Sequence, residues 1–137
     1  MTGARAAGDA RLPLPRRARV LVVEDESLVA MMLADMLEEI GCTVVGPVAS
    51  GAGALRLLEG GEALDLALLD VNLGGETAYG VADALSRRDV PFIFVSGYGA
   101  SGLDQGYAAA PVLAKPFQPA TLARTIGEIL ALSTEKK

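Results

Sequence analysis

Short aliphatic runs alternate along the chain with longer segments of helical periodicity, and this alternation limits the folds that the chain can adopt. Residues 20–23 and 66–69 are uninterrupted apolar runs, and another lies within residues 90–99. Such runs are typical of strands that are buried on both faces, as in parallel sheets covered by helices. The alternation therefore predicts an α/β fold.

The same pattern places the individual elements. We expect strands over residues 19–23, 42–50, 66–69, 90–99 and 111–117, and helices over residues 28–40, 51–60, 77–88 and 118–133. Residues 99–110 are rich in glycine, so the fourth helix is expected to be short, mobile or displaced. Right-handed crossovers would wind these elements into a doubly wound, flavodoxin-like sheet of five parallel strands in the order 2-1-3-4-5.

Charge is distributed unevenly along the chain. Residues 1–19 contain five Arg and one Asp, whereas residues 20–137 contain 7 Lys or Arg and 16 Asp or Glu. We expect a flexible basic arm over residues 1–18, one folded domain over residues 19–133 and a short tail over residues 134–137. The acidic domain is a poor candidate for binding nucleic acid, and no output module is expected after it.

The amino-acid composition excludes several kinds of protein and of functional site. Cys42 is the only cysteine, which together with the absence of an export signal indicates a reducing, cytoplasmic environment. The apolar runs are far shorter than the roughly 20 residues that span a bilayer, so no membrane insertion is expected. The chain contains no histidine, which removes Ser-His-Asp triads and histidine metal sites.

Polar residues follow four of the five predicted strands. Because the carboxyl ends of parallel strands meet at one edge of a sheet, these residues are expected to gather there. Separate roles remain open, since Ser27 could cap the next helix, Ser96 could begin a turn, and Lys115 could be a solvated charge. The residues at this edge are Glu24 and Asp25, Asp70 and Asn72, Ser96 and Gly97, and Lys115 and Pro116.

A cluster of three carboxylates stays ionised only if positive charge compensates it. Mg²⁺ together with Lys115 would balance the charges of the clustered acids, and Mg²⁺ prefers oxygen ligands with retained water. We expect Asp25, Asp70 and the main-chain carbonyl of Asn72 as ligands, with Glu24 holding one of the waters. A carboxylate oxygen beside Mg²⁺ and an ammonium group is a phosphoryl acceptor, which makes Asp70 the expected phosphorylation site.

The four segments that contain these polar residues resemble the sequence signatures of a known family. "VLVVEDE", "LLDVNL", "FVSGYG" and "KPF" are similar, in this order, to the receiver domain of bacterial response regulators, over about residues 19–133. The resemblance implies a cis peptide bond before Pro116. It also implies roles for five residues: the phosphoacceptor Asp70, the acidic pair Glu24 and Asp25, the switch hydroxyl Ser96 and the lysine Lys115.

"PFIFVSGYG" is similar to the Pro-Phe-x-Phe-Ala-Thr-Gly-Tyr-Gly motif of the FAT GUY receivers, which are mostly stand-alone regulators in alphaproteobacterial stress signalling. Val95 and Ser96 replace the Ala and Thr of that motif, so the hydroxyl is kept. Many receivers carry an aromatic ring where this chain has Val112, and that ring moves when the hydroxyl engages the phosphoryl group. We therefore hypothesise that Tyr98 or residues 97–109 report phosphorylation instead.

The expected function is that of a single-domain response regulator and not of an enzyme. Asp70 would receive a phosphoryl group, with Mg²⁺, from a sensor histidine kinase or a histidine phosphotransfer protein. The regulator would then act in a phosphorelay or through contacts with a downstream protein that the sequence does not identify.

Two alternatives stay open. A Mg²⁺-dependent phosphohydrolase with an aspartyl-phosphate intermediate needs a second carboxylate two residues after the nucleophile, where this chain has Asn72. A receiver-like adaptor that is not phosphorylated would not need the intact acidic pair and lysine.

Three methionines in the first predicted helix could form a docking face for a helix of a kinase. Met31 could be exposed for this role, whereas Met32 and Met36 are expected to fill the core.

Overall fold

The computed structural model describes residues 17–74, 76–97, 105–107 and 110–135. Nearly all of the predicted basic arm therefore lies outside the described residues. The same holds for Tyr98 and for most of the segment 97–109. None of the described helices is long and apolar enough to cross a membrane.

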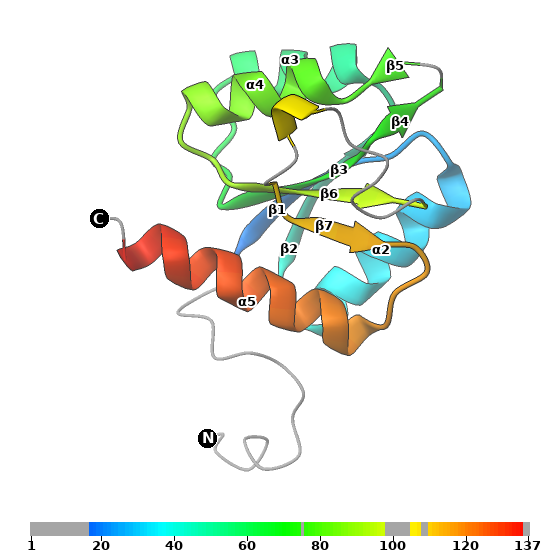
Figure 1. The fold of residues 1–137 in the computed structure, drawn as a ribbon, viewed down its shortest axis with the longest axis vertical. Helices are drawn as coiled ribbons and strands as arrows, with labels where there is room; N and C mark the ends of the chain where they lie inside the picture. The colour runs from blue at the N-terminus through cyan, green and yellow to red at the C-terminus, as the bar shows by residue number, and fades with distance from the viewer. Residues whose placement is uncertain (1–16, 75, 98–104, 108–109, 136–137) are drawn as a thin grey trace.

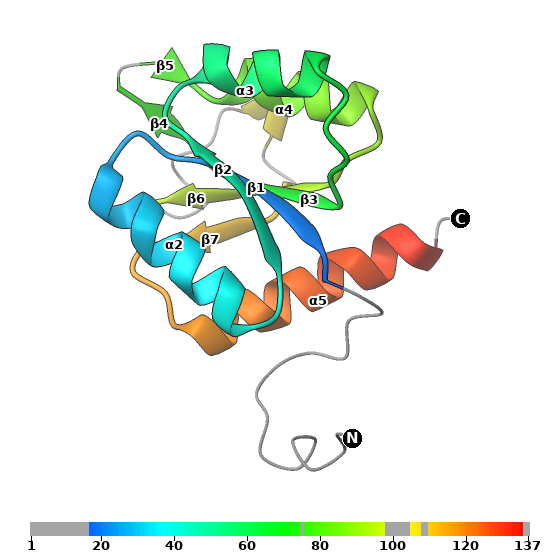
Figure 2. The same ribbon diagram turned by 180° about the vertical axis from the view of Figure 1, so that it is seen from behind.

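A parallel sheet lies at the centre of the molecule, with strands in the order β2-β1-β3-β6-β7. Helices cover both of its faces: α2 and α5 lie on one side, and α3 and α4 lie on the other (Figures 1 and 2). The predicted doubly wound sheet and its strand order are confirmed. The strands are β1 (Arg19–Val23), β2 (Thr43–Val48), β3 (Leu66–Asp70), β6 (Phe92–Ser96) and β7 (Val112–Ala114).

The helices follow the predicted segments closely. They are α2 (Ser27–Glu39), α3 (Gly51–Glu59), α4 (Tyr79–Arg87) and α5 (Pro119–Glu135). Helix α3 begins at Gly51 as predicted, and the backbone N–H of Gly53 donates to Oγ of its N-cap residue Ser50 at 3.0 Å. Between β6 and β7, residues Gln105–Tyr107 form a short 3₁₀ helix, η2.

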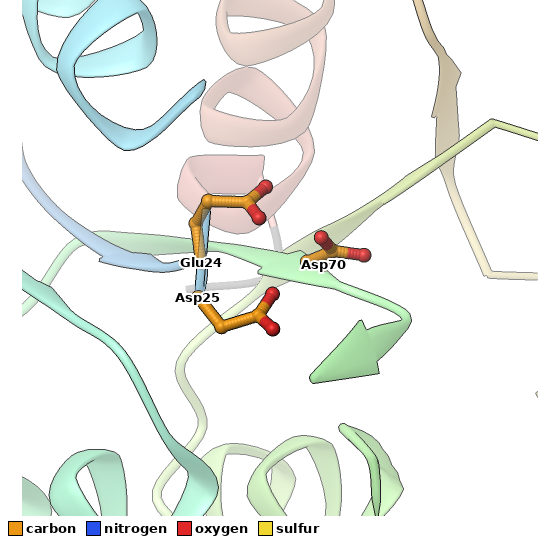
Figure 3. A group of neighbouring side chains, drawn as sticks. All are labelled: Glu24, Asp25 and Asp70. Atoms are coloured by element: carbon orange, nitrogen blue, oxygen red, sulfur yellow. The ribbon is translucent and has the colours of Figure 1, made fainter. Parts of the chain in front are cut away.

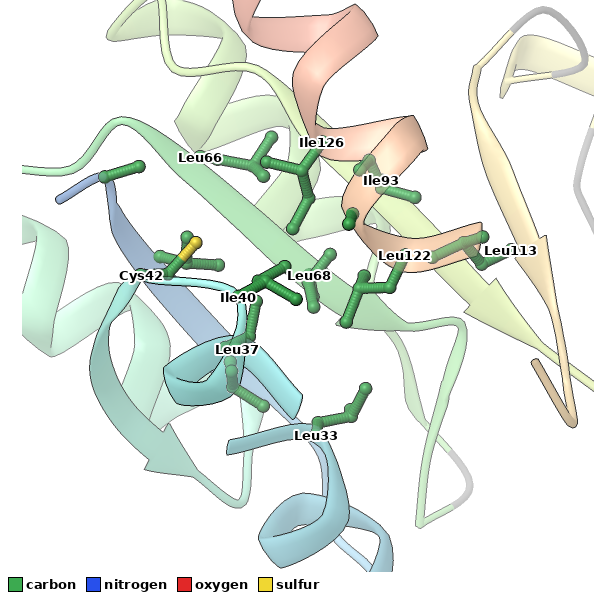
Figure 4. Packing of buried hydrophobic residues seen from close by; sticks show 14 of the residues in the cluster. Leu33, Leu37, Ile40, Cys42, Leu66, Leu68, Ile93, Leu113, Leu122 and Ile126 are labelled. Carbon is green, nitrogen blue, oxygen red and sulfur yellow. The ribbon is translucent and has the colours of Figure 1, made fainter. Parts of the chain in front are cut away.

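Alternate residues of the central strands face opposite helical layers. In β1, Val20 and Val22 belong to the apolar cluster beneath α2 and α5, whereas Leu21 and Val23 belong to the cluster beneath α3 and α4. Figure 4 shows the first cluster, in which side chains from both helices meet the central strands. The middle of the sheet is therefore apolar on both faces, and polar side chains are left to the strand ends.

A small hairpin between β3 and α4 was missing from the sequence-based prediction. Strands β4 (Asn72–Leu73) and β5 (Glu76–Thr77) pair antiparallel, and the glycine pair at 74–75 joins them. The expectation that Thr77 begins the next helix was therefore wrong: Thr77 pairs with Asn72, and α4 begins at Tyr79. Strands of two residues are too short to produce a periodic pattern in the sequence.

The prediction that Met32 fills the core was also wrong. Its side chain is 55% exposed, close to the 60% of Met31, whereas Met36 is partly buried against the core as expected. The buried stripe of α2 runs through Leu33 and Leu37. Because successive helical residues are about 100° apart, Met32 is turned away from that stripe towards solvent.

Tyr107 of η2 contacts several other aromatic rings, and this aromatic cluster was not predicted from the sequence. Its ring stacks on Tyr79 with centroids 4.7 Å apart, and it meets the edge of Phe94 at 5.6 Å. The hydroxyl donates to the carboxylate of Asp83 and lies 3.3 Å from the carbonyl oxygen of Tyr79. Val112 and Tyr107 both pack against the apolar cluster beneath α3 and α4, so this side of the sheet has an aromatic ring although β7 supplies none.

We expect the Tyr107 hydroxyl to stabilise the fold separately from its ring. In Tyr107→Phe the ring contacts remain but the bond to Asp83 is lost, so the free energy of unfolding should fall by about 0.5–1.5 kcal/mol. Tyr107→Ala should lose more, because the stacking contacts disappear as well. Urea denaturation measures both changes. Equal losses in the two variants would contradict this division.

Candidate functional site

Only three polar or charged side chains are buried among the residues that the structure describes, and all three were predicted site residues. They are Glu24, Asp70 and Ser96, with exposed fractions of 2%, 8% and 4%. Each lies at or directly after the carboxyl end of a strand, β1, β3 or β6. Burying such groups is energetically unfavourable unless hydrogen bonds or opposite charges pair with them, so partners are expected nearby.

The acidic residues converge because β1 and β3 are parallel neighbours. Val23 is paired in register with Leu69, which brings Glu24 level with Asp70 at the edge of the sheet. One carboxylate oxygen from each of Glu24, Asp25 and Asp70 lies within 4.8 Å of the others. Figure 3 shows the three carboxylates gathered at the ends of the two strands.

Lys115 joins two of these acids from the far edge of the sheet. Its Nζ donates to Oδ2 of Asp70 at 3.2 Å and to Oε1 of Glu24 at 3.4 Å. The backbone N–H of Lys115 donates to the carbonyl oxygen of Ser96 at 2.8 Å, which holds the end of β7 against β6. Lys115 is therefore not a freely solvated charge.

Backbone donors hold the remaining oxygens of the two buried acids. The N–H of Asn72 donates to Oδ1 of Asp70 at 3.0 Å, and the N–H of Glu26 donates to Oε2 of Glu24 at 3.1 Å. Glu26 is the N-cap residue of α2 and makes no side-chain capping bond, and Ser27 is the first residue of the helix, so the alternative role of Ser27 as the cap does not hold.

The negative charges at this edge are only partly compensated. Burial of its carboxylate, together with the neighbouring Asp70, raises the pKa of Glu24 to about 7, although the Glu26 N–H and Lys115 act in the opposite direction. Burial alone would lower the pKa of Lys115, but the charges and hydrogen bonds of Asp70 and Glu24 outweigh it and the pKa is raised. Each group thus depends on the charge state of the others.

The other predicted residues surround this cluster. Ser96 ends β6 beside β3, and Gly97 after it is exposed, with open space where a side chain would be. Asn72 is exposed and begins β4. The Lys115-Pro116 peptide bond is cis, as the resemblance implied. The structure therefore brings all of the predicted site residues to one edge of the sheet.

The donor set fits a hard divalent cation. The three clustered side chains offer carboxylate oxygens only, without nitrogen or sulfur ligands, and Asp25 is exposed to solvent while Glu24 is not. Mg²⁺ is commonly bound by one or two carboxylates while it keeps several waters. Glu24, Asp25 and Asp70 could therefore hold such an ion at the open edge.

Comparison with known proteins agrees with this geometry. The family model described as "Response regulator receiver domain" matches residues 20–127. The Phyllosphere-induced regulator PhyR of Methylorubrum extorquens is 33% identical over 115 residues, which cover 81% of this chain and 43% of PhyR. The curated relatives are longer proteins, and this chain spans between 40% and 57% of their lengths.

Solved structures show the same relationship over nearly complete chains. The solution structure of SdrG from Sphingomonas melonis Fr1 is 43% identical, with a TM-score of 0.75, and the match covers 85% of this chain and 99% of SdrG. The BeF3-activated conformation of SdrG from Pseudomonas melonis Fr1 is 44% identical, with a TM-score of 0.72 and the same coverage. The chain therefore belongs to the receiver domain family of two-component response regulators.

Proposed function

We propose that this chain is a single-domain response regulator that accepts a phosphoryl group on Asp70 from a phosphohistidine of another protein. One observation carries the proposal: a nearly buried carboxylate at a strand end is bonded to Lys115 and lies beside two further acids. This arrangement concentrates charge where nothing in the packing of the core requires it. The BeF3-activated conformation of SdrG, a relative, supports a role in phosphoryl chemistry.

The transfer needs positioning and positive charge more than covalent chemistry from the protein. An oxygen of Asp70 forms the new bond to phosphorus, while the P–N bond of the donor breaks and its electron pair returns to the imidazole, which takes up a proton from solvent. Lys115 already lies 3.2 Å from this carboxylate and neutralises charge on the transferred oxygens. Ser96 offers a hydroxyl donor, and the open space at Gly97 leaves room for the group.

The same edge would hold Mg²⁺. Asp25, Asp70 and the main-chain carbonyl of Asn72 are the proposed ligands, with Glu24 holding a water. When bound, Mg²⁺ would supply two positive charges next to the acids and the incoming phosphoryl oxygens. Together with Lys115 this brings the three carboxylates to electrical neutrality, which the described protein groups do not achieve alone.

An apolar face beside the acceptor suits the docking of a phosphodonor protein. Leu28, Met31 and Met32 are 77%, 60% and 55% exposed and lie on successive turns at the start of α2. This helix begins two residues after Asp25, so a helix docked there would be close to Asp70. Apolar anchors at spacings of three and four residues are typical of helix recognition.

The proposal includes the remaining expectations for this chain. The partners are a histidine kinase or histidine phosphotransfer protein upstream and a protein target downstream, with neither nucleic acid nor membrane insertion involved. The chain signals without an enzymatic reaction of its own, in the cytoplasm. The division into an arm over residues 1–18, a receiver domain over residues 19–133 and a tail over residues 134–137 belongs to the same proposal.

Phosphorylation should depend on Asp70. Incubation with autophosphorylated histidine kinases, or with a small-molecule phosphodonor and Mg²⁺, should label the wild-type protein, and Asp70→Asn should abolish the label because the nucleophilic oxygen is lost. Asp35→Asn, which changes an exposed carboxylate on α2, is the control and should be labelled normally. A wild-type protein that no phosphodonor labels would refute the proposed function and favour a receiver-like adaptor.

The stability of the metal-free protein should fall as the pH rises through the titration of Glu24. With an ordinary pKa of 4.5 in the unfolded chain and about 7 in the fold, Glu24 keeps its proton more readily when folded. Between these values the folded state binds more protons than the unfolded state, so the free energy of unfolding decreases, by roughly 1–3 kcal/mol.

Denaturation in urea at pH 5 and pH 8 measures this effect. Glu24→Gln should show a smaller decrease than the wild type, whereas Glu38→Gln on the exposed side of α2 should behave like the wild type. Mg²⁺ should restore part of the stability of the wild type at pH 8. Identical pH dependence in all three proteins would count against the strained charge balance at this edge.

The apolar face of α2 should affect transfer from a protein donor only. Met31→Ser combined with Met32→Ser should slow phosphotransfer from the cognate histidine protein by about ten-fold or more, because anchors of a docked helix are lost. Labelling by a small-molecule phosphodonor should be unchanged. Leu55→Ser, on α3 across the sheet, is the control. Equal slowing with both kinds of donor would place the effect within the acceptor site.

A further inference from the structure

The β4–β5 hairpin lies next to the acidic cluster and is held in place by packing and by a backbone hydrogen bond. It begins two residues after Asp70, and its Leu73 is 4% exposed and packs into the core beneath α4. The N–H of Ala78 donates to the carbonyl oxygen of Val71 at 3.1 Å, which closes the base of the hairpin. Gly74 begins the two-residue loop with φ of +59°, a conformation that two-residue hairpins require and that glycine adopts without strain.

Asp25 differs from the other two acids in how its carboxylate is held. Glu24 and Asp70 each accept from a backbone N–H and from Lys115. Among the residues that the structure describes, Asp25 makes no hydrogen bond or ion pair. Its position therefore depends on the atoms that surround it.

Gly74 lies beside this carboxylate, and its lack of a side chain leaves the carboxylate room. A Cβ atom built on Gly74 would lie 3.3 Å from Oδ2 of Asp25, and no other atom outside its chain neighbours lies within 4 Å of it. A contact of that length is tighter than nine in ten real Cβ contacts, so one partner would have to move by a few tenths of an ångström. The hairpin is anchored in the core, and the unbonded carboxylate is the partner that moves.

We infer that Gly74 is a positioning residue for the metal site and that the missing side chain sets the selectivity of that site for Mg²⁺ over larger cations. This inference rests on the proposed function only in taking Asp25 as a ligand. Mg²⁺ requires near-ideal octahedral geometry with ligands at about 2.0–2.1 Å, whereas Ca²⁺ accepts variable geometry at about 2.3–2.6 Å. A displacement of a few tenths of an ångström therefore penalises Mg²⁺ far more than Ca²⁺.

The test compares two glycines that both have a positive φ but differ in what a side chain would meet. Gly61, with φ of +79°, has nothing within 4 Å of a built Cβ, so Gly61→Ala introduces the backbone strain without the contact. The dissociation constants of Mg²⁺ and Ca²⁺ are measured for the wild type, Gly74→Ala and Gly61→Ala by calorimetric titration or by shifts of backbone amide resonances. Both methods suit a chain without tryptophan.

We expect Gly74→Ala to weaken Mg²⁺ binding by about ten-fold, the loss typical of removing support around a metal ligand, and to change Ca²⁺ binding by less than about three-fold. Gly61→Ala should bind both ions as the wild type does. If Gly74→Ala does not fold, Gly74→Asn introduces the same Cβ in a residue that tolerates positive φ better.

Three results would overturn the inference: wild-type affinity for Mg²⁺ in Gly74→Ala, the same loss for both ions, or the same loss in Gly61→Ala. The proposed function is tested separately by the wild-type protein. If the wild type binds Mg²⁺ and is phosphorylated while Gly74→Ala is indistinguishable from it, only the role of Gly74 fails. If the wild type binds no Mg²⁺ at all, the proposed metal site fails as well.

Discussion

The contact of Lys115 with Asp70 and Glu24 is the interaction on which the functional edge of this protein depends. Carboxylates withdrawn from water are strongly unfavourable unless an opposite charge and hydrogen bonds replace the lost hydration. Here one ammonium group serves both buried acids, at 3.2 and 3.4 Å, and backbone N–H groups serve their other oxygens. Removing Lys115 would leave both buried acids without an opposite charge among the groups they contact.

Lys115 neutralises only part of the negative charge of the three acids, and the remaining negative charge favours binding of a cation. Three acids face one lysine, and the raised pKa of Glu24 reflects the excess of negative charge. A bound cation would remove that excess. The features that strain the metal-free protein therefore also give it affinity for a divalent ion. The apolar clusters on both faces of the sheet stabilise the fold, and this stabilisation offsets the unfavourable repulsion among the acids.

The sequence allowed much of this to be predicted because strand ends and strand interiors have different compositions. A residue such as Asp70 directly after the apolar run 66–69 could be assigned to the edge without knowledge of the packing. The features that escaped prediction depend on contacts that leave no periodic trace. The stacking of Tyr107 on Tyr79 joins residues far apart in the chain, and the β4–β5 hairpin consists of strands only two residues long. Met32 was misassigned because an apolar residue beside a buried stripe has the same pattern whether it is covered or exposed.

The sequence by itself determined the α/β alternation, the order of the strands and the set of polar residues that reach one edge, because burial on both faces and right-handed crossovers leave few other arrangements. Only the tertiary structure decided how these residues are held. It determines which oxygen Lys115 contacts, that Asp25 lacks a hydrogen bond within the described part of the chain, and that a side chain at position 74 would meet the Asp25 carboxylate. Those details depend on displacements of tenths of an ångström. Such displacements are set by the packing of the whole domain and not by any local pattern of residues.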